Sequence, residues 1–341
     1  MEGTEPVSGS GTPAKTIDKR IAALRRFALS ITILTIVGHL LLGFEPSAAQ
    51  VLVTLFTAYG LELVLETVEA RCQQRTPRFL DSGLIGFVDF MLPAHISAMS
   101  IGLLLYPGDR LWPSALAAAI AICTKYLVRA PVNGRMRHVL NPSNVAVAAL
   151  LTFYPFVGPA PSYHFTETTS GLLDWLIPGI LLVFGTFLNV RLTGKAPLIA
   201  AWVLGFAAQA VIRAVLVPEE NTLLGGLGMM VGATFILFTN YMITDPGTTP
   251  ARPRNQVAFG LGAATVYGLL VSLHVVYGLF YCVVIVCLVR AAGLWWIELR
   301  RRRLPAGHRD AVDAGRGDRA PQRPLVSAQV TIVNEAKGAT G

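Results

Sequence analysis

The amino-acid sequence predicts an all-α, polytopic integral membrane protein with about ten transmembrane helices. Of its 341 residues, 53% are hydrophobic and 14% are charged, whereas a soluble domain carries roughly 25% charged residues. Apolar runs of bilayer length recur along the chain, and Lys and Arg gather in every second segment between them. These three observations exclude a soluble globular protein and make the lipid bilayer a main partner of the chain.

Each apolar run is bounded by Pro, Gly or charged residues, and each approaches the length of about 20 residues that a helix needs to cross a bilayer. The predicted spans are 27–44, 49–68, 83–105, 112–129, 142–158, 172–190, 196–217, 223–243, 256–273 and 274–292. Only a turn near His274 separates the last two. Residues 1–26 are rich in Gly, Ser, Thr and Pro, and residues 300–341 are basic and polar, so we expect two disordered tails around a ten-helix membrane domain of residues 27–299.

Lys and Arg predict the orientation of these spans, because positive residues concentrate in cytoplasmic loops. Arg110 is almost alone on the side that is poor in positive charge. The other side receives the N-terminal cluster and the basic residues of segments 71–78, 129–137, 191–195, 252–254 and 300–303. We therefore expect a multi-pass protein of the cell membrane with both termini in the cytoplasm. Five helices in each half would give the halves opposite orientations, as in inverted-repeat transporters and channels.

The net charge of +8 would favour nucleic-acid binding in a soluble protein. Here the basic residues lie between apolar runs, where membrane topology explains them, so no nucleic-acid partner is expected. The four cysteines form no CxxC motif and no cluster with histidine, and we expect no metal site.

Ionisable residues inside spans are costly in lipid and are therefore candidates for an ion or ligand path. Glu62 and Glu66 stand four residues apart, on one helix face near the cytoplasmic end of the second span. With Glu69 and Arg71 following, the alternative interpretation is a charged cap at the membrane surface.

Asp89 and His95 lie in the third span on either side of Pro93, which would free backbone carbonyls to line a cavity. The alternative is a solvated Asp89 near the cytoplasmic entrance. His39 and Arg213 are expected to pair with backbone groups or lipid head groups.

Two polar segments at span ends stand out. Asn141 can cap the fifth span, with Pro142 at the first helical position, and the free amides there suit a phosphate or another anion. Thr244, Asp245 and Thr248 belong to a hydroxyl-rich turn that ends the eighth span. By charge topology both segments approach the cytoplasmic side, and we expect them to lie close together.

A ligand site at this mouth would use Asn141 as donor, Asp245 as acceptor and Lys125, near the cytoplasmic end of the fourth span, as the neutralising charge. The candidate cofactor-binding residues are Lys125, Asn141, Pro142, Thr244, Asp245 and Thr248. In the alternative interpretation Asn141 only caps a helix, Asp245 only ends one, and Lys125 extends its ammonium to the membrane surface.

The chain resembles the NqrB/RnfD family, the flavin-bearing membrane subunits of sodium-translocating NADH:quinone reductase and Rnf electron-transport complexes. Members have ten spans, an FNPA-type motif in the position of Asn141-Pro142, and an ATDPVT-type motif in the position of Thr244-Asp245-Pro246. The similarity runs from about residue 27 to residue 292. The chain also looks like UnbU-like stand-alone relatives that accompany enediyne antibiotic biosynthesis.

The resemblance implies an electron-transfer subunit that handles a flavin or a quinone, with a partner redox protein carrying the electron donor. The family attaches FMN to the Thr of a D-x-x-[ST]-G-A-T motif. This chain keeps Ser170-Gly171 but has Leu172-Leu173 in place of Ala-Thr, so FMN or riboflavin would be non-covalent if bound. The alternative function is a urea-channel-like permease for a small molecule, with no redox role.

Overall fold

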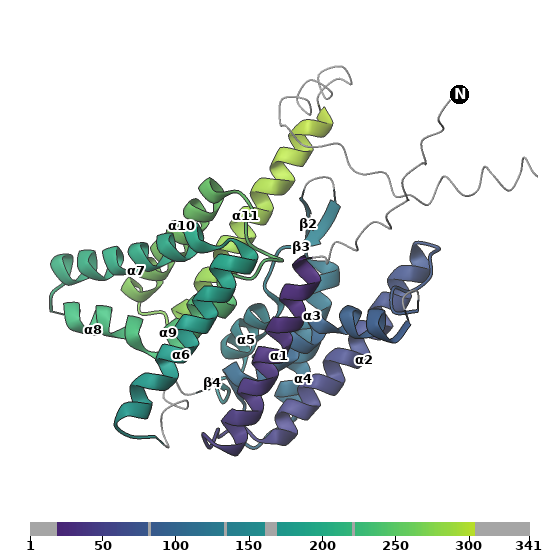
Figure 1. Ribbon diagram of the computed structural model, residues 1–341. Helices are drawn as coiled ribbons and strands as arrows, with labels where there is room; N and C mark the ends of the chain where they lie inside the picture. The colour runs from purple at the N-terminus through teal and green to yellow at the C-terminus, as the bar shows by residue number, and fades with distance from the viewer. Residues whose placement is uncertain (1–18, 81–82, 133–134, 161–168, 220–221, 304–341) are drawn as a thin grey trace, which may run out of the picture. The chain divides into compact units, whose positions relative to one another are not determined.

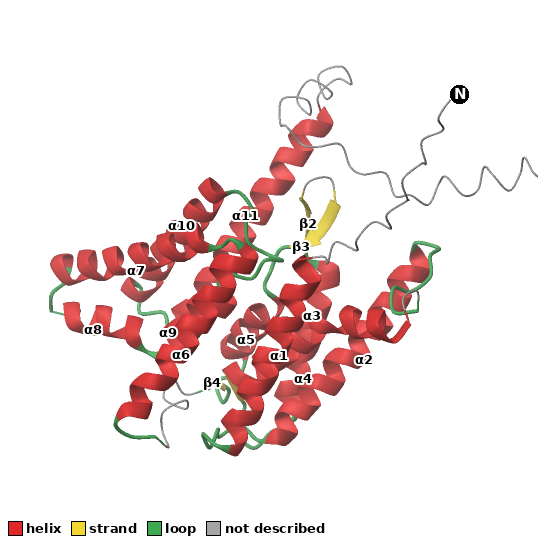
Figure 2. Cartoon of the chain, viewed as in Figure 1, coloured by secondary structure: helices red, strands yellow, loops and turns green. Residues whose placement is uncertain are grey.

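The part of the chain that the computed structural model describes consists of residues 19–80, 83–132, 135–160, 169–219 and 222–303. These residues are mostly helical, as Figure 2 shows, which confirms the all-α prediction for them. The chain divides into two compact units, residues 1–294 and residues 295–341, which are described separately. The predicted disorder of residues 1–18 and 304–341 lies outside the described residues.

The first five predicted spans correspond to five helices, here called the first half (Figure 1). They are α1 Lys19–Leu40, α2 Ala48–Cys72, α3 Gly83–Leu104, α4 Trp112–Leu127 and α5 Pro142–Phe153. Four short strands lie between or beside them, pairing β1 Leu105–Tyr106 with β4 Gly158–Pro159 and β2 Arg129–Val132 with β3 Arg135–His138, both antiparallel.

The other five predicted spans correspond to the second half, in which π-helical and 3₁₀ turns interrupt the α-helices. Its elements are α6 Leu172–Leu188, η1 Asn189–Thr193, α7 Ala196–Leu216, α8 Leu223–Gly228, η2 Met229–Val231, α9 Ala233–Leu237, η3 Phe238–Met242, α10 Pro253–Ser272 and α11 Gly278–Arg303. The predicted turn between the last two spans is present, and His274 adopts a positive φ of 58° there.

Five helices are long and apolar enough to cross a membrane on their own within the described residues: α2, α3, α6 with part of η1, α7 and α11. A sixth span results if the bent pair 223–231 and 233–242, whose parts meet at 60°, is counted as one. The chain is therefore a multi-pass membrane protein, and ten spans remain a prediction.

Two helix boundaries and one connection differ notably from the prediction. α1 begins at Lys19, because Ile21, Ala22 and Leu24 continue the helical pattern into the basic leader, so residues 19–26 are helical where a disordered tail was predicted. α11 continues to Arg303, beyond the predicted limit of the membrane domain. The basic segment between α4 and α5 forms the β2–β3 hairpin, whose strands of four residues are too short to show a pattern in the sequence.

The predicted eighth span is broken into α8, η2, α9 and η3. Four glycines at positions 225, 226, 228 and 232 explain the break, because each lowers helix stability by up to about 1 kcal/mol relative to Ala. The backbone turns extended at Gly232, with ψ of 145°, before α9 begins.

Corresponding helices of the two halves make similar contacts. In the first half, α1 packs on α3, and α2 packs on both α3 and α4. In the second half, α6 packs on α9 and η3, and α7 packs on α8, η3 and α10. The first helix of each half thus contacts the third, and the second contacts the third and the fourth.

Residues of the second unit are described from Trp295 to Arg303. They form the last turns of α11, where the Arg300 guanidinium lies 4.5 Å from the Trp296 ring centroid. Arg302 pairs with Glu298 over 3.0 Å.

Candidate functional site

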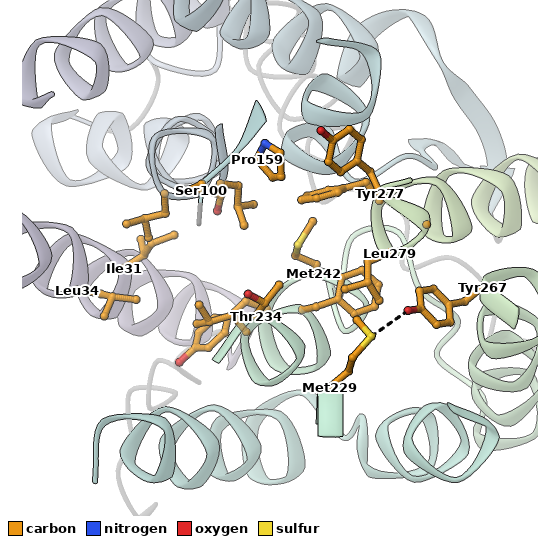
Figure 3. A pocket seen from close by; sticks show the side chains of 18 of the residues that line it. Ile31, Leu34, Ser100, Pro159, Met229, Thr234, Met242, Tyr267, Tyr277 and Leu279 are labelled. Carbon is orange, nitrogen blue, oxygen red and sulfur yellow. Dashed lines mark hydrogen bonds between the residues drawn. The ribbon is translucent and has the colours of Figure 1, made fainter. Parts of the chain in front are cut away.

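A cavity of about 590 Å³ lies between helices of the two halves, and we call it the central cavity (Figure 3). α1, α3 and β4 line it from the first half, and η2, α9, η3, α10 and the start of α11 line it from the second. None of its described lining residues is charged. Its polar groups are the hydroxyls of Ser30, Ser100, Thr234, Tyr241, Tyr267 and Tyr277. Such a cavity suits a neutral, largely apolar ligand with a few hydrogen-bonding groups.

Aromatic packing fixes one wall of the central cavity. The buried ring of Phe206 lies 4.7 Å from Phe235 and 4.9 Å from Tyr267, measured between ring centroids. Trp202 stacks on Phe235, and its indole nitrogen donates a hydrogen bond to Thr239 over 2.9 Å. Because these rings interlock between α7, α9 and α10, the second half supplies a rigid surface.

Asn141 connects the start of α5 to the central cavity. Its side-chain oxygen accepts from the backbone amide of Asn144, which confirms that Asn141 caps the helix. Its side-chain nitrogen donates to the carbonyl oxygen of Met242 over 3.1 Å, and Met242 lines the cavity. Pro142 occupies the first turn of α5, as predicted. The two motif-bearing segments therefore lie in contact, as the sequence predicted.

Asp245 organises the turn that follows η3. Its carboxylate accepts from the amide of Gly247 over 3.0 Å and from the hydroxyl of Thr248 over 2.9 Å, which is an Asx-type turn. The Thr244 hydroxyl, almost fully buried, donates to the carbonyl of Asn240 over 2.7 Å. These contacts agree with the alternative in which Asp245 ends a helix, and neither Asp245 nor Asn141 lines the central cavity.

A buried lysine and a partly buried arginine hold the same turn. Lys195, before α7, donates to the carbonyl of Pro250 over 2.8 Å, and Arg290 of α11 donates to the carbonyl of Thr248 over 2.7 Å. Burial lowers the pKa of Lys195 to about 8, against the opposing effect of Asp245. Sequence reasoning missed Lys195 because it lies in a loop, where a lysine is usually solvated.

Two π-helical turns meet at buried asparagines. Asn189 of η1 donates to the carbonyl of Asn240 in η3 over 2.6 Å. At Gly185 a Cβ atom would lie 2.7 Å from the Cβ of Asn240, so only glycine permits this approach of α6 to η3. The polar segment that ends the eighth predicted span is therefore packed inside the protein.

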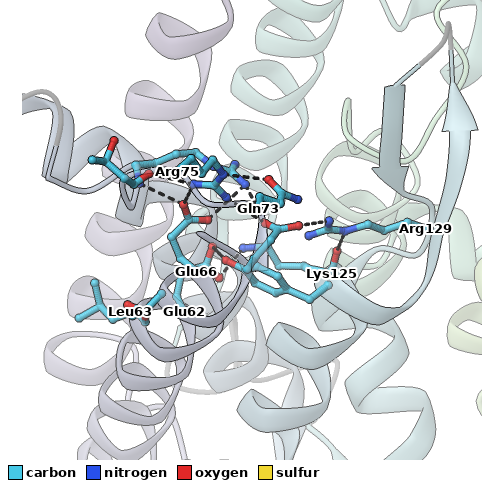
Figure 4. A network of polar contacts seen from close by, with 12 residues as sticks. Glu62, Leu63, Glu66, Gln73, Arg75, Lys125 and Arg129 are labelled. Atoms are coloured by element: carbon cyan, nitrogen blue, oxygen red, sulfur yellow. Dashed lines mark hydrogen bonds and ion pairs between the residues drawn. The ribbon is translucent and has the colours of Figure 1, made fainter. Parts of the chain in front are cut away.

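Glu62, Glu66 and Glu69 form a charged cluster with α4 and the loop after α2 (Figure 4). The ammonium of Lys125 lies 2.8 Å from the carboxylate of Glu62, and both side chains are largely buried. The Tyr126 hydroxyl also donates to Glu62, over 3.3 Å. Lys125 thus pairs with Glu62, and the structure does not place it beside Asn141 as the ligand-site prediction required.

Arginines neutralise the other two carboxylates of this cluster. Arg75 lies 2.5 Å and Arg78 lies 3.2 Å from Glu66, which is fully buried. Arg129 pairs with Glu69. The hydrogen bond to Glu66 raises the pKa of Arg75 above its usual value. The cluster supports the interpretation of a charged cap, although its cations are not the predicted Arg71.

Asp89 and His95 of α3 each contact a different turn of α1. Asp89 forms a bidentate pair with Arg25, at 2.6 and 2.7 Å. Neither Asp89 nor His95 lines the central cavity, and α3 continues through Pro93.

His95 links three helices through its two ring nitrogens. Nε2 lies 2.7 Å from the Thr32 hydroxyl of α1, which donates to the carbonyl of Ala28 over 2.7 Å. Nδ1 lies 2.6 Å from the Tyr59 hydroxyl of α2. His95 of α3 is therefore a polar link between α1, α2 and α3. His39 contacts the carbonyls of Thr35 and Pro46, as predicted for a residue that pairs with the backbone.

No protein-family model matches this sequence, and a search of curated proteins found no significant match. The resemblance to the NqrB/RnfD family therefore depends on the motifs alone and stays a prediction.

The central cavity also bears on the predicted cofactors. The phosphate of FMN requires cations or free amides, and none of the described residues that line the cavity provides a charge. The prediction of a non-covalently bound FMN or riboflavin therefore stays a prediction.

Proposed function

We propose that the chain is a membrane-embedded electron-transfer protein that binds a quinone in the central cavity. The observation that carries the proposal is the uncharged lining of this cavity of about 590 Å³ between the two halves. A quinone ring is flat and neutral and accepts hydrogen bonds through its carbonyls, which suits apolar walls with a few hydroxyl donors. When bound, it supplies reversible uptake of electrons and protons.

The residues of the chain would bind and orient this ring. Thr234 of α9 and Ser100 of α3 offer hydroxyls from opposite halves, and the side chains of Met242 and Leu279 provide apolar contacts (Figure 3). Asn141 would hold the Met242 backbone in place. Electrons would come from a partner redox protein on the cytoplasmic side of the cell membrane, where both termini are predicted to lie. The electron transfer would serve secondary metabolism, such as enediyne biosynthesis.

A second function, a permease for a neutral small molecule, is favoured by the broken helix. Inverted-repeat transporters bind their substrates between the repeats, beside discontinuous helices. The repeated contact pattern of the two halves and the 60° bend between residues 223–231 and 233–242, next to the cavity, match that arrangement.

Quinone titration of the purified protein tests the leading proposal. We expect decylubiquinone to quench the tryptophan fluorescence saturably, and Thr234→Phe, which fills the cavity, to weaken binding. Leu224→Phe is the matched control, because Leu224 is 86% exposed on α8. Unchanged affinity in Thr234→Phe, or no saturable binding, refutes the proposal. Uptake of a small molecule by vesicles without quinone binding would support the permease.

Absorbance of the same preparation tests for flavin, and a denaturing gel tests for covalent attachment. We expect no fluorescent band after coexpression with a flavin transferase, because Leu172 and Leu173 carry no hydroxyl to form the phosphoester. The nearby Thr169 hydroxyl donates to Asp174 over 2.6 Å. A flavin band that survives denaturation would contradict this expectation.

A further inference from the structure

A second, smaller cavity of about 200 Å³ adjoins the central cavity, and we call it the side cavity. Ala210 and Arg213 of α7 and the start of α8 line it. Three residues, Met229, Tyr267 and Val271, line both cavities. The two cavities therefore meet at these shared side chains.

The two cavities differ in polarity. The described lining of the central cavity is uncharged, whereas the side cavity contains the guanidinium of Arg213. Gln209 positions this group, because its side-chain oxygen accepts from Nε of Arg213 over 2.8 Å and its amide donates to the carbonyl of Phe206 over 2.9 Å. A guanidinium only donates hydrogen bonds, so it favours ligands with a carbonyl or an anionic oxygen.

Met229 and Tyr267 line both cavities, and Figure 3 shows the contact between their side chains. The Tyr267 hydroxyl donates to the sulfur of Met229 over 3.5 Å, and a thioether is a weak acceptor. Tyr267 is fixed by its stacking on Phe206. Met229 is an unbranched side chain on the short turn η2, in the glycine-rich broken helix, so it can change rotamer at little cost.

We propose that Met229 and Tyr267 are a gate through which ligands pass from the side cavity into the central cavity. Access is from the side of the membrane that is poor in positive charge, because segment 218–222 between α7 and α8 has no Lys or Arg. Arg213 and Thr222 both line the side cavity, and the guanidinium of Arg213 selects compounds with an acceptor oxygen at one end. This proposal shares one premise with the proposed function, namely that the central cavity holds a ligand. It does not require that the ligand is a quinone.

A cysteine introduced by Thr234→Cys reports access to the central cavity without any natural ligand. Intact cells or spheroplasts are treated with the anionic, membrane-impermeant sulfonatoethyl methanethiosulfonate, and peptide mass spectrometry measures modification at position 234. We expect labelling from the non-cytoplasmic side. Met229→Trp should slow it about tenfold, which corresponds to an added barrier of about 1.4 kcal/mol. Arg213→Gln should slow the anionic reagent more than the neutral methyl methanethiosulfonate.

Three comparisons decide the outcome. Leu224→Trp, also on α8 but 86% exposed, should leave the rate unchanged. The gate would be overturned if only the neutral reagent labelled position 234 and if Leu34→Trp, but not Met229→Trp, slowed that labelling. This result would mean that ligands enter the central cavity laterally from the bilayer. Labelling from the cytoplasmic side alone would overturn the gate as well. Cys282 and Cys287 are buried, so their labelling would show that a variant has unfolded. If Met229→Trp unfolds the protein in this way, Met229→Phe is used in its place.

This experiment separates the gate from the proposed function. A protein that shows gated labelling but binds no quinone keeps the gate and loses the electron-transfer proposal. A protein that binds quinone but is labelled at the same rate in every variant keeps that proposal and loses the gate.

Discussion

The side-chain amide of Asn141 donates a hydrogen bond to the carbonyl oxygen of Met242 over 3.1 Å, so the start of α5 holds the wall of the central cavity. This contact joins residues that are 101 positions apart. It joins the Asn-Pro start of α5 directly to η3, which ends just before the Thr-Asp-Pro segment.

Substitution of Asn141 separates its two roles. Asn141→Ser keeps the cap on α5 but cannot reach Met242, which should cost about 1 kcal/mol. Asn141→Ala also loses the cap, for about 1 kcal/mol more. Thermal unfolding in detergent measures both losses. The control is Ser47→Ala, which removes the cap of α2 and should lower stability without changing the quinone affinity. If Asn141→Ser and Ser47→Ala bind quinone with equal affinity, the contact with Met242 does not shape the cavity.

Removing one partner of the Glu62–Lys125 pair should lower the free energy of unfolding strongly, whereas replacing both partners with apolar residues should lower it little. Lys125→Met leaves a largely buried carboxylate without its cation and should destabilise the protein by about 3 kcal/mol. Combining it with Glu62→Leu should recover most of that loss. A double-mutant cycle on unfolding midpoints measures the coupling. If the single and double variants are equally unstable, the two residues are not coupled as their 2.8 Å separation implies.

Lys195 should make stability increase with pH above about pH 8. Its pKa is about 8 in the folded protein and has the ordinary value of 10.5 when the chain unfolds. Between these values the unfolded chain holds a proton that the folded chain lacks, so raising the pH favours folding by up to about 1.4 kcal/mol per pH unit. Relative to Lys195→Met, the wild-type protein should gain stability from about pH 8 to pH 10. A constant difference over that range would contradict the lowered pKa.

Reporter fusions test the predicted topology. A reporter inserted in residues 158–171 should lie outside the cytoplasm, and one fused after the C-terminus should lie inside it, because Lys and Arg concentrate on one side. Reporters on the same side would refute the ten-span arrangement. A third fusion in segment 218–222 should agree with the first and also tests the side from which the gate opens.

Much of the helical fold was predictable, because apolar runs of bilayer length have few other stable forms. The four glycines after Thr222 were visible as well, although their effect on the eighth span was not anticipated. Glu62 and Lys125 were each identified, but their pairing joins positions 63 residues apart, which one sequence cannot reveal. The central cavity was missed because its lining consists of ordinary apolar residues from several elements, and nothing in their spacing distinguishes them from core.

The two π-helical turns, η1 and η3, make the chain sensitive to changes in length. A π-turn contains one residue more than an α-turn, and η3 uses its wide turn to bring the Asn240 carbonyl to Asn189 of η1. Deleting a single residue near Asn240 would remove this wide turn directly before the Asp245 turn, which Lys195 and Arg290 hold by their bonds to Pro250 and Thr248. Insertions and deletions in this segment should therefore be far less tolerated than substitutions, even on its outer face.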